Sequence, residues 1–333
     1  MTDKKYKVVH TDAFPNRVIR EELEELEKIN TKVVLSTCKT EDEVIEAARG
    51  ADAILSVFSP LTRHVIETLQ DCKVIVRYGI GVDNIDVEAA TEHNIVVANV
   101  PDFCFEEVSN HVMALLLACA KKLAILNNNT RQGRWGHFPA PMGPIHGQVL
   151  GLVGCGNIGQ AVAKKAQCFS LRILGYDPYI GESVAREHGI TLVSLPELLK
   201  ESDFVSVHTP LTKETRHIIG ENEFRLMKPS AYFINTARGA VVDEQALIKA
   251  LREKWIAGAG LDVFEKEPID PNNPLLKMDN VVVTPHCASY SDASFSLLRR
   301  RVGEAAASVL SGRWPRSVVN KTVKPKINLV RKG

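Results

Sequence analysis

Residues 148–177 of this 333-residue chain read QVLGLVGCGNIGQAVAKKAQCFSLRILGYD, and this stretch decides the fold. Its apolar run Val149–Val153 predicts a buried parallel strand. A helical pattern through Ala161–Ala166 follows, and a second apolar run, Leu171–Tyr176, ends at Asp177. A strand, a helix and a second strand in this order predict a βαβ unit of a doubly wound α/β sheet.

The turn between the first strand and the helix has the spacing G-x-G-x-x-G, formed by Gly154, Gly156 and Gly159. In a dinucleotide-binding unit the first glycine permits a tight turn, the second lets the backbone approach the pyrophosphate, and the third lets helix and strand pack closely. The helix N-terminus then offers free N–H groups to the phosphates. A glycine-rich turn without a ligand is the alternative, which the complete strand–helix–strand context disfavours.

Asp177 follows Gly159 by eighteen residues. This is close to the spacing of about 20 residues expected for the carboxylate that binds a ribose 2′-OH. A carboxylate at this place repels the 2′-phosphate of NADP. The sequence therefore predicts a Rossmann domain with NAD as its cofactor.

Composition excludes several other classes of protein. Hydrophobic residues make up 45% and charged residues 24% of the chain, and the net charge is +1, so we expect an ordinary globular protein without nucleic-acid or membrane partners. Residues 1–10 lack the apolar core of a secretory signal. Seven cysteines without paired spacing indicate reduced thiols in the cytoplasm. No C-x-x-C or H-E-x-x-H spacing occurs, so no metal site is expected.

The alternation of apolar runs and helical patterns predicts two α/β domains. In the first hundred residues the predicted strands are Lys7–His10, Lys32–Ser36, Ala53–Val57, Val74–Arg77 and Ile95–Ala98, separated by helices at Val18–Ile29, Glu41–Ala48 and Leu61–Leu69. A long helix at Phe105–Leu126 and a Gly/Pro/Asn-rich arm at Asn127–Gly147 follow.

The second domain continues with strands at Phe204–His208, Tyr232–Asn235, Ala257–Val263 and Val281–Thr284, which would complete a six-stranded sheet. The last helix, Ser291–Leu310, then leaves this domain. We infer a discontinuous substrate domain of residues 1–102 and 289–333, with a dinucleotide-binding domain of residues 103–288 inserted in it.

Three polar segments follow predicted strands, where ligands bind in open α/β sheets. They are NTARG at 235–239, DVFEKEP at 262–268 and TPH at 284–286. Arg238, Glu267 and His286 could each be an ordinary polar surface residue. Together they have the chemistry for reducing a 2-keto acid, because a guanidinium binds the carboxylate, an imidazole donates a proton to the alkoxide, and a carboxylate orients the imidazole.

A Gly-x-Gly turn within RYGIGVDNID, residues 77–86, allows two interpretations. The glycines at 79 and 81 could only shape the turn, or their N–H groups could bind a small anion. The residue types alone leave both open. Asp86 is placed to cap the helix that follows.

The ordered motifs RYGIGVDNID, GCGNIG, GYDP, HTPLTKET, NTARGAVVDE, LDVFEKEP and TPH resemble the D-isomer-specific 2-hydroxyacid dehydrogenase family over nearly the whole chain. Within it, the chain is most similar to phosphoglycerate dehydrogenases without a regulatory domain and to the C-terminal-binding proteins. The resemblance implies a Rossmann domain inserted in a flavodoxin-like substrate domain, a homodimer built around residues 105–147, and catalysis by Arg238, Glu267 and His286.

The resemblance also implies the ligand contacts. Those to the cofactor are Gly154, Cys155, Gly156, Asn157, Ile158, Gly159, Asp177, Thr209, Pro210, Thr215, Thr236, Ala237, Arg238, Asp262, His286 and Ser289, with Asp262 on the nicotinamide carboxamide. Those to the substrate are Arg77, Gly79, Ile80, Gly81, Arg238 and His286, so the family analogy favours the anion-binding interpretation of the Gly-x-Gly turn.

We expect an NAD-dependent enzyme that interconverts a small (2R)-2-hydroxy acid and its 2-keto acid. Two alternatives stay open: an NADH-sensing scaffold like the C-terminal-binding proteins, or oxidation of phosphite or formate on the same fold. Ser289 stands where C-terminal-binding proteins carry a tryptophan, so their bulky substrate preference is not expected. Formate-oxidising enzymes of this superfamily lack the acid–base carboxylate that Glu267 would supply, so this residue argues against formate oxidation. The chain stops at Gly333, so no effector-binding domain is expected.

Overall fold

The structure is a computed structural model that describes residues 5–13, 19–136 and 142–331. The chain divides into two compact units. The first contains Met1–Phe103 and Ser291–Gly333, and the second contains Cys104–Tyr290. The chain thus returns to the first unit after completing the second. The assignment of substrate and cofactor to the two units stays a prediction.

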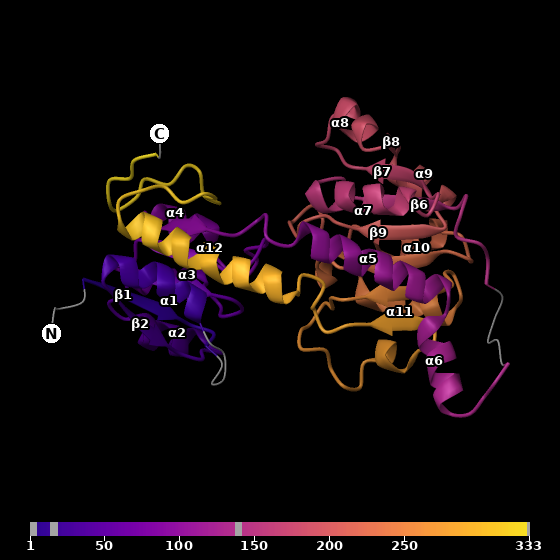
Figure 1. Ribbon diagram of the computed structural model, residues 1–333, viewed down its shortest axis with the longest axis horizontal. Coiled ribbons are helices and arrows are strands. Elements are labelled where there is room, and N and C mark those ends of the chain that lie inside the picture. Colours follow the sequence, from indigo (N-terminus) through magenta and orange to yellow (C-terminus); the bar gives the residue numbers. More distant parts are fainter. Residues whose placement is uncertain (1–4, 14–18, 137–141, 332–333) are drawn as a thin grey trace. The chain divides into compact units, whose positions relative to one another are not determined.

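The first unit is built on a five-stranded parallel sheet in the order β2-β1-β3-β4-β5 (Figure 1). This is the strand order of flavodoxin-like folds. The strands are β1 Tyr6–His10, β2 Thr31–Leu35, β3 Ala53–Ser56, β4 Val74–Arg77 and β5 Val96–Ala98. The helices are α1 Arg20–Leu26, the 3-10 turn η1 Glu27–Ile29, α2 Glu41–Ala48, α3 Arg63–Thr68, α4 Val87–Glu92 and α12 Asp292–Leu310.

Local capping explains where two of these helices begin. Thr40 and Glu43 form a capping box at the start of α2, in which each side chain satisfies a free N–H group of the other residue. Asp86 accepts a hydrogen bond from the N–H of Ala89 at the start of α4, so its predicted role as a cap is confirmed. The predicted start of the first helix, Val18, lies outside the described residues.

The second unit contains a seven-stranded parallel sheet in the order β12-β11-β10-β9-β6-β7-β8. Counted from β6, this is the Rossmann order with one further strand at the edge. The strands are β6 Val149–Val153, β7 Arg172–Tyr176, β8 Ile190–Leu192, β9 Phe204–Val207, β10 Tyr232–Asn235, β11 Gly258–Leu261 and β12 Val281–Val283. The helices are α5 Phe105–Ala120, α6 Leu123–Arg131, α7 Asn157–Gln167, α8 Glu182–Glu187, α9 Leu195–Glu201, α10 Glu221–Leu226 and α11 Glu244–Arg252, with 3-10 turns η2 Gly239–Val241 and η3 Pro274–Lys277.

The predicted count of six strands was wrong because β8 was missed. This strand has three residues, and only Ile190 is buried. It pairs with β7 alone, at the edge of the sheet. Such a short, half-exposed strand leaves no apolar run for a sequence pattern to detect.

The predicted single helix at Phe105–Leu126 was also wrong. The chain breaks at Lys121–Lys122, and α5 and α6 meet at a bend of 62°. Lys122 adopts a left-handed backbone with φ of 52°, and its ammonium donates a hydrogen bond to the hydroxyl of Tyr232 at 3.1 Å. No single described helix is long and apolar enough to cross a membrane. The bent pair of α5 and α6 reaches that length and apolar content only when its two helices are taken together.

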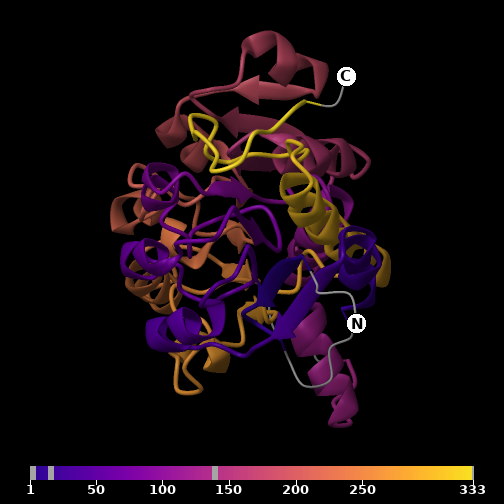
Figure 2. The same cartoon turned by 90° about the vertical axis from the view of Figure 1, so that its left-hand side faces the viewer.

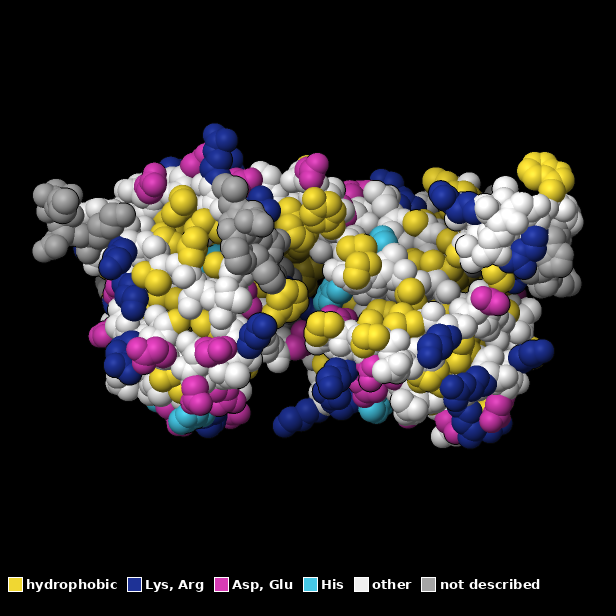
Figure 3. Space-filling model, turned by 90° about the horizontal axis from the view of Figure 1, so that it is seen from below, with side chains coloured by type: hydrophobic (Ala, Val, Ile, Leu, Met, Phe, Trp, Pro, Cys, Tyr) yellow, Lys and Arg dark blue, Asp and Glu magenta, His cyan; other side chains and the backbone are white. Residues whose placement is uncertain are grey.

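The two helices differ in how they are buried. α5 packs against α7 and the sheet and buries eight side chains, whereas α6 buries none among its residues. In both Figure 1 and Figure 2, α6 projects from the body of the second unit. On the face shown in Figure 3, basic and acidic side chains are interspersed over each unit, as the net charge of +1 suggests.

Candidate functional site

The glycine-rich turn lies where β6 meets α7 in the second unit. Gly154 has φ of 98°, and a Cβ on it would lie 2.9 Å from the backbone of His208 and Thr209. A Cβ on Gly159 would lie 2.5 Å from the carbonyl oxygen of Gly154. Nothing lies within 4 Å of a Cβ on Gly156. The turn is therefore packed tightly on one side and open at Gly156, the position that a pyrophosphate would approach.

Asp177, directly after β7, is hydrogen-bonded to this turn. One of its carboxylate oxygens accepts a hydrogen bond from the N–H of Cys155 at 2.8 Å. The other accepts one from the N–H of Tyr179, also at 2.8 Å. The structure thus brings the predicted ribose-binding carboxylate beside the predicted phosphate-binding turn, from positions 22 residues apart.

Four buried polar atoms in and just after β9 and β10 have no hydrogen-bond partner among the described residues. They are Ser206 Oγ, His208 Nε2, Thr209 Oγ1 and Thr236 Oγ1. A buried polar group without a partner costs about 1–3 kcal/mol, so a polar ligand at this edge would stabilise the protein. The open turn, Asp177 and these atoms together fit a dinucleotide.

Burial lowers the pKa of His208 from 6.5 to about 4. The unfolded chain keeps the ordinary pKa, so between pH 6.5 and 4 it binds more protons than the folded protein. The free energy of unfolding therefore falls as the pH falls through this window, and the difference between the two pKa values corresponds to about 3 kcal/mol. Urea unfolding of the cofactor-free protein at pH 7 and pH 4.5 measures this loss.

The same experiment on His208→Gln isolates the contribution of this imidazole. We expect the variant to lose less stability between the two pH values than the parent protein. His64→Gln is the matched control, because His64 is exposed. Equal pH dependence in the His208 variant and the parent would show that His208 is not the responsible group.

His286 and Glu267 form a close pair after β12 and β11. The Nδ1 atom of His286 lies 2.6 Å from one carboxylate oxygen of Glu267, and the other oxygen accepts a hydrogen bond from the N–H of Phe264 at 3.0 Å. Burial acts to raise the pKa of Glu267, but the hydrogen bond and charge of His286, the Phe264 N–H and the charge of Arg238 outweigh it and lower this pKa. Glu267 is therefore ionised and accepts the Nδ1 proton, so Nε2 is the nitrogen that can serve a substrate.

Asp262 fixes the backbone on which His286 sits. Its carboxylate accepts hydrogen bonds from the N–H groups of Cys287 at 2.9 Å and Ala288 at 2.8 Å. Its carbonyl oxygen accepts the N–H of His286 at 2.8 Å. These bonds hold His286 at φ of 51°, a left-handed backbone that is uncommon for residues other than glycine. Asp262 thus positions the imidazole in addition to any contact with a ligand.

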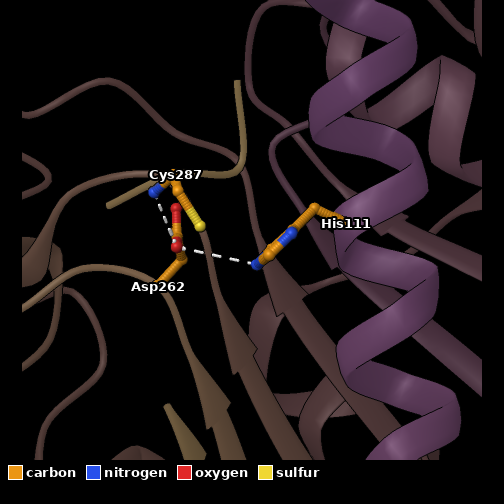
Figure 4. Close-up of side chains that lie close together, drawn as sticks. All are labelled: His111, Asp262 and Cys287. Atoms are coloured by element: carbon orange, nitrogen blue, oxygen red, sulfur yellow. Dashed lines mark hydrogen bonds and ion pairs between the residues drawn. The ribbon is translucent and has the colours of Figure 1, made fainter. Parts of the chain in front are cut away.

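A hydrogen-bonded chain links Asp262 to α5, and no sequence pattern predicted it. The hydroxyl of Thr284 donates to Asp262 at 2.6 Å, and the Nε2 atom of His111 lies 2.9 Å from the same hydroxyl. Figure 4 shows His111 reaching from α5 toward Asp262 and Cys287. His111 and Thr284 are 173 residues apart, so only the fold brings them together.

Arg238 follows β10 in a loop that Asn235 shapes. The Asn235 side chain donates to the carbonyl of Arg238 at 2.9 Å and accepts the N–H of Ala237 at 3.0 Å. The next residue, Gly239, lies directly against the backbone of Phe264 and Glu265, and a Cβ on Gly239 would overlap the Phe264 carbonyl. This contact joins the Arg238 loop to the loop that carries Glu267.

Gly239→Ala is expected to lower kcat/KM by about 10²-fold, because the added methyl group must push the two loops apart and a displacement of about 1 Å has an effect of this size. Steady-state kinetics measures the loss. Gly181→Ala is the control, since the nearest atom to a Cβ at Gly181 is 3.9 Å away. Unchanged kinetics in the Gly239 variant would refute the role of this contact.

The predicted substrate turn lies in the first unit, at the carboxyl end of β4. The carbonyl of Ile80 accepts a hydrogen bond from the side chain of Asn99 at 2.6 Å, and Gly79 has φ of 128°. Arg77 folds back on the turn, where its guanidinium donates to the carbonyl of Tyr78. Gly81 completes the turn.

Asp12, after β1, is a further organising residue that the sequence did not reveal. It is buried and accepts the N–H groups of three consecutive residues, Val57, Phe58 and Ser59, at 2.7–2.9 Å. The side chain of Asn84 ties the same loop to the segment after β4 through the carbonyl of Ser59 at 2.9 Å. The loop after β3 is therefore held beside the predicted substrate turn, with the Phe58 side chain exposed.

The predicted cofactor contacts all lie in the second unit, near the carboxyl ends of its strands. Asn157 and Ile158 begin α7, and the Thr215 hydroxyl donates to the carbonyl of Pro210 at 2.6 Å, which closes the loop after β9. Ser289 follows the segment that Asp262 binds. These positions form one edge of the sheet, as their placement after successive strands requires.

A family model, related sequences and solved structures all match most of this chain. The model of the NAD-binding domain of D-isomer specific 2-hydroxyacid dehydrogenases matches residues 113–288. A glyoxylate reductase from Korarchaeum cryptofilum is 44% identical over 285 residues, which cover 84% of this chain and 86% of the relative.

Solved structures resemble nearly the whole chain. A D-lactate dehydrogenase from Aquifex aeolicus, in complex with NAD and lactic acid, has a TM-score of 0.84 and 30% identity, and the match covers 94% of this chain and 99% of that one. An NADPH-dependent glyoxylate/hydroxypyruvate reductase from Sinorhizobium meliloti, in complex with NADP and malonate, has a TM-score of 0.86 and 29% identity, with coverage of 96% and 98%.

Proposed function

Because the chain belongs to the D-isomer specific 2-hydroxyacid dehydrogenase family, we propose that Arg238, Glu267 and His286 are its catalytic residues. The protein is a NAD(P)-dependent oxidoreductase that interconverts 2-hydroxy and 2-keto acids. The observation that carries the residue assignment is the 2.6 Å contact between His286 and Glu267, in loops that Gly239 joins to Arg238.

In the direction of reduction, each residue acts on a different part of the keto acid. Arg238 binds the carboxylate and polarises the carbonyl at C2. The reduced nicotinamide, when bound, supplies a hydride to C2. The carbonyl oxygen takes a proton from Nε2 of His286 as its negative charge develops. Glu267 accepts the hydrogen bond from Nδ1–H and stabilises the imidazolium, whose Nε2 proton is the one donated.

We propose NAD rather than NADP as the preferred cofactor. The support is the carboxylate of Asp177, which lies beside the glycine-rich turn through its bond to the Cys155 N–H and would repel a 2′-phosphate. Relatives of known structure bind either cofactor, since the A. aeolicus enzyme was solved with NAD and the S. meliloti enzyme with NADP. The preference of this chain therefore rests on its own residues.

We propose a small 2-keto acid such as glyoxylate or hydroxypyruvate as substrate. The relatives named above act on acids of this size. Arg77 and the N–H groups of the Gly79–Gly81 turn would bind the substrate carboxylate as an anion. The seven cysteines, an odd number without paired spacing, fit a reducing compartment such as the cytoplasm.

A homodimer formed through the α5–α6 region is part of the same proposal. The support is apolar surface that the other described residues leave uncovered: α6 buries no side chain, and Leu123 and Trp135 are 53% and 90% exposed. The predicted arm includes residues 137–141, which lie outside the described residues. Light scattering should give the mass of two chains, and the mass of one chain would contradict this assembly.

The substrate assignment is tested by initial rates with a series of 2-keto acids graded by length and charge, each with NADH and with NADPH. We expect the highest kcat/KM with a two- or three-carbon acid and NADH. The same assay run with phosphite and NAD tests oxidation of phosphite. Absence of turnover with every acid, together with tight NADH binding, would favour the NADH-sensing scaffold instead.

A further inference from the structure

Three side chains of different chemistry converge beside the catalytic loop of the second unit. They are His111 on α5, Asp262 after β11 and Cys287 after β12, and their ligand atoms all lie within 4.8 Å of one another. Figure 4 shows the imidazole, carboxylate and thiol pointing toward a common region. An imidazole nitrogen, a carboxylate oxygen and a thiol sulfur are the donors that Zn²⁺ takes in proteins.

The charge of the cluster favours a cation. The Asp262 side chain has 0% exposure, and its hydrogen-bond donors among the described residues are the Thr284 hydroxyl, two backbone N–H groups and the Cys287 thiol, all neutral. Its one possible ionic partner among the described residues is His111, whose Nε2 lies 3.6 Å from Oδ1. Burying a carboxylate without a full positive charge is costly, so a divalent cation would supply what this site lacks.

The spacing of His111 and Asp262 fits a tetrahedral metal site. With zinc–ligand bonds of about 2.0–2.3 Å, the ligands of a tetrahedral zinc ion are about 3.3–3.8 Å apart. The distance of 3.6 Å between His111 and Asp262 falls in this range. The His111 side chain is 21% exposed and Cys287 is partly exposed, so an ion can enter from their side.

We propose that His111, Asp262 and Cys287 bind one Zn²⁺ ion when the cofactor is absent. The ion would take Nε2 of His111, Oδ1 of Asp262 and the sulfur of Cys287, with water as its fourth ligand. As the bonds of sulfur and Nε2 to zinc form, the Cys287 S–H bond breaks and its proton passes to solvent. Because the Thr284 hydroxyl donates its proton to Asp262, His111 Nε2 carries the proton in its contact with Thr284, and this proton moves through solvent to Nδ1 when Nε2 binds the ion. No oxidation or reduction takes place.

The site has a consequence for activity, which rests on the proposed function. Asp262 is the proposed contact of the nicotinamide carboxamide, so zinc and the cofactor would compete for the same carboxylate. Zinc binding would also pull on the Cys287 and Ala288 backbone that Asp262 holds, and thereby displace His286. Zinc is therefore an inhibitor that competes with NADH.

Cobalt(II) reports on this site without any turnover, because a tetrahedral cobalt–thiolate centre absorbs in the near-ultraviolet and visible. Titration of the cofactor-free, full-length protein with Co²⁺ should give this spectrum with one ion per chain, and Zn²⁺ should abolish it. Cys287→Ser should remove the sulfur-to-cobalt band, and His111→Asn should weaken binding at least tenfold. Cys168→Ser is the control, because Cys168 is exposed and lies outside the cluster.

Absence of the thiolate band in the parent protein, or a band that persists in Cys287→Ser, would overturn the metal site. Circular dichroism of each variant shows that it is folded, so loss of the band reports on the ligand. Saturating NADH should release the cobalt, and retention of the full spectrum would overturn the competition. The cobalt spectrum reports metal binding independently of turnover. A protein that binds cobalt but reduces no keto acid would therefore refute the proposed function and leave the metal site intact.

Discussion

Arg238→Ala is expected to lower kcat/KM for the best 2-keto acid by at least about 10²–10³-fold, the loss found when a donor to a developing negative charge is removed. In the proposed mechanism the guanidinium both binds the substrate carboxylate and polarises the carbonyl, so KM should rise and kcat should fall together. Steady-state rates of NADH oxidation over a wide range of substrate concentration separate the two parameters.

Two further variants define what Arg238 contributes. Arg238→Lys keeps the positive charge but loses the planar fork that binds a carboxylate bidentately, so its kcat/KM should lie between those of the parent and the alanine variant. Arg186→Ala is the matched control, because Arg186 is exposed on α8 in a weak ion pair with Glu182 at 3.8 Å. Parent-like kinetics in Arg238→Ala would remove Arg238 from the mechanism.

His286→Asn is expected to lower kcat by about 10²–10⁴-fold, the usual share of general acid–base catalysis. Asparagine can still form a hydrogen bond to Glu267 but cannot donate a proton at neutral pH. KM for the keto acid should change much less than kcat, because Arg238 continues to bind the carboxylate. The same kinetic measurement, with the dissociation constant of NADH from fluorescence, tests this separation.

His64→Gln, at an exposed position of the first unit, is the control for removing a histidine. A large rise in KM with unchanged kcat would mean that His286 binds substrate without donating a proton. Glu267→Gln should give a smaller loss than His286→Asn, because the imidazole stays in place and loses only its ionised partner. The order of the two losses therefore distinguishes the proton donor from the residue that orients it.

Local sequence patterns predicted those parts of the fold that depend on neighbouring residues. The strands Val74–Arg77, Val149–Val153 and Tyr232–Asn235 begin and end where their apolar runs do, and the helix Glu41–Ala48 follows its capping box. The short strand β8 and the break at Lys122 were missed, since neither changes the apolar pattern enough to be seen.

The candidate site likewise combines residues that the sequence could predict with residues that it could not. The G-x-G-x-x-G spacing and the residues after each strand identified the glycine turn, Arg238, Glu267 and His286 as candidates. The residues that hold them were not predictable: Gly239 depends on the backbone at Phe264, and His111 reaches Thr284 from 173 residues away. Such contacts exist only once the sheet is assembled, so no spacing rule reveals them.

We expect this chain to transfer a hydride directly from the cofactor to C2 of a 2-keto acid. Reduction of hydroxypyruvate with NADH deuterated at C4 of the nicotinamide tests it, with the product analysed by mass spectrometry and NMR. We predict glycerate of (2R) configuration with one deuterium at C2. Direct hydride transfer would be contradicted if no glycerate formed, or if cofactor labelled on one face of C4 and cofactor labelled on the other face both gave glycerate without deuterium. Glycerate of (2S) configuration would contradict the expected stereochemistry.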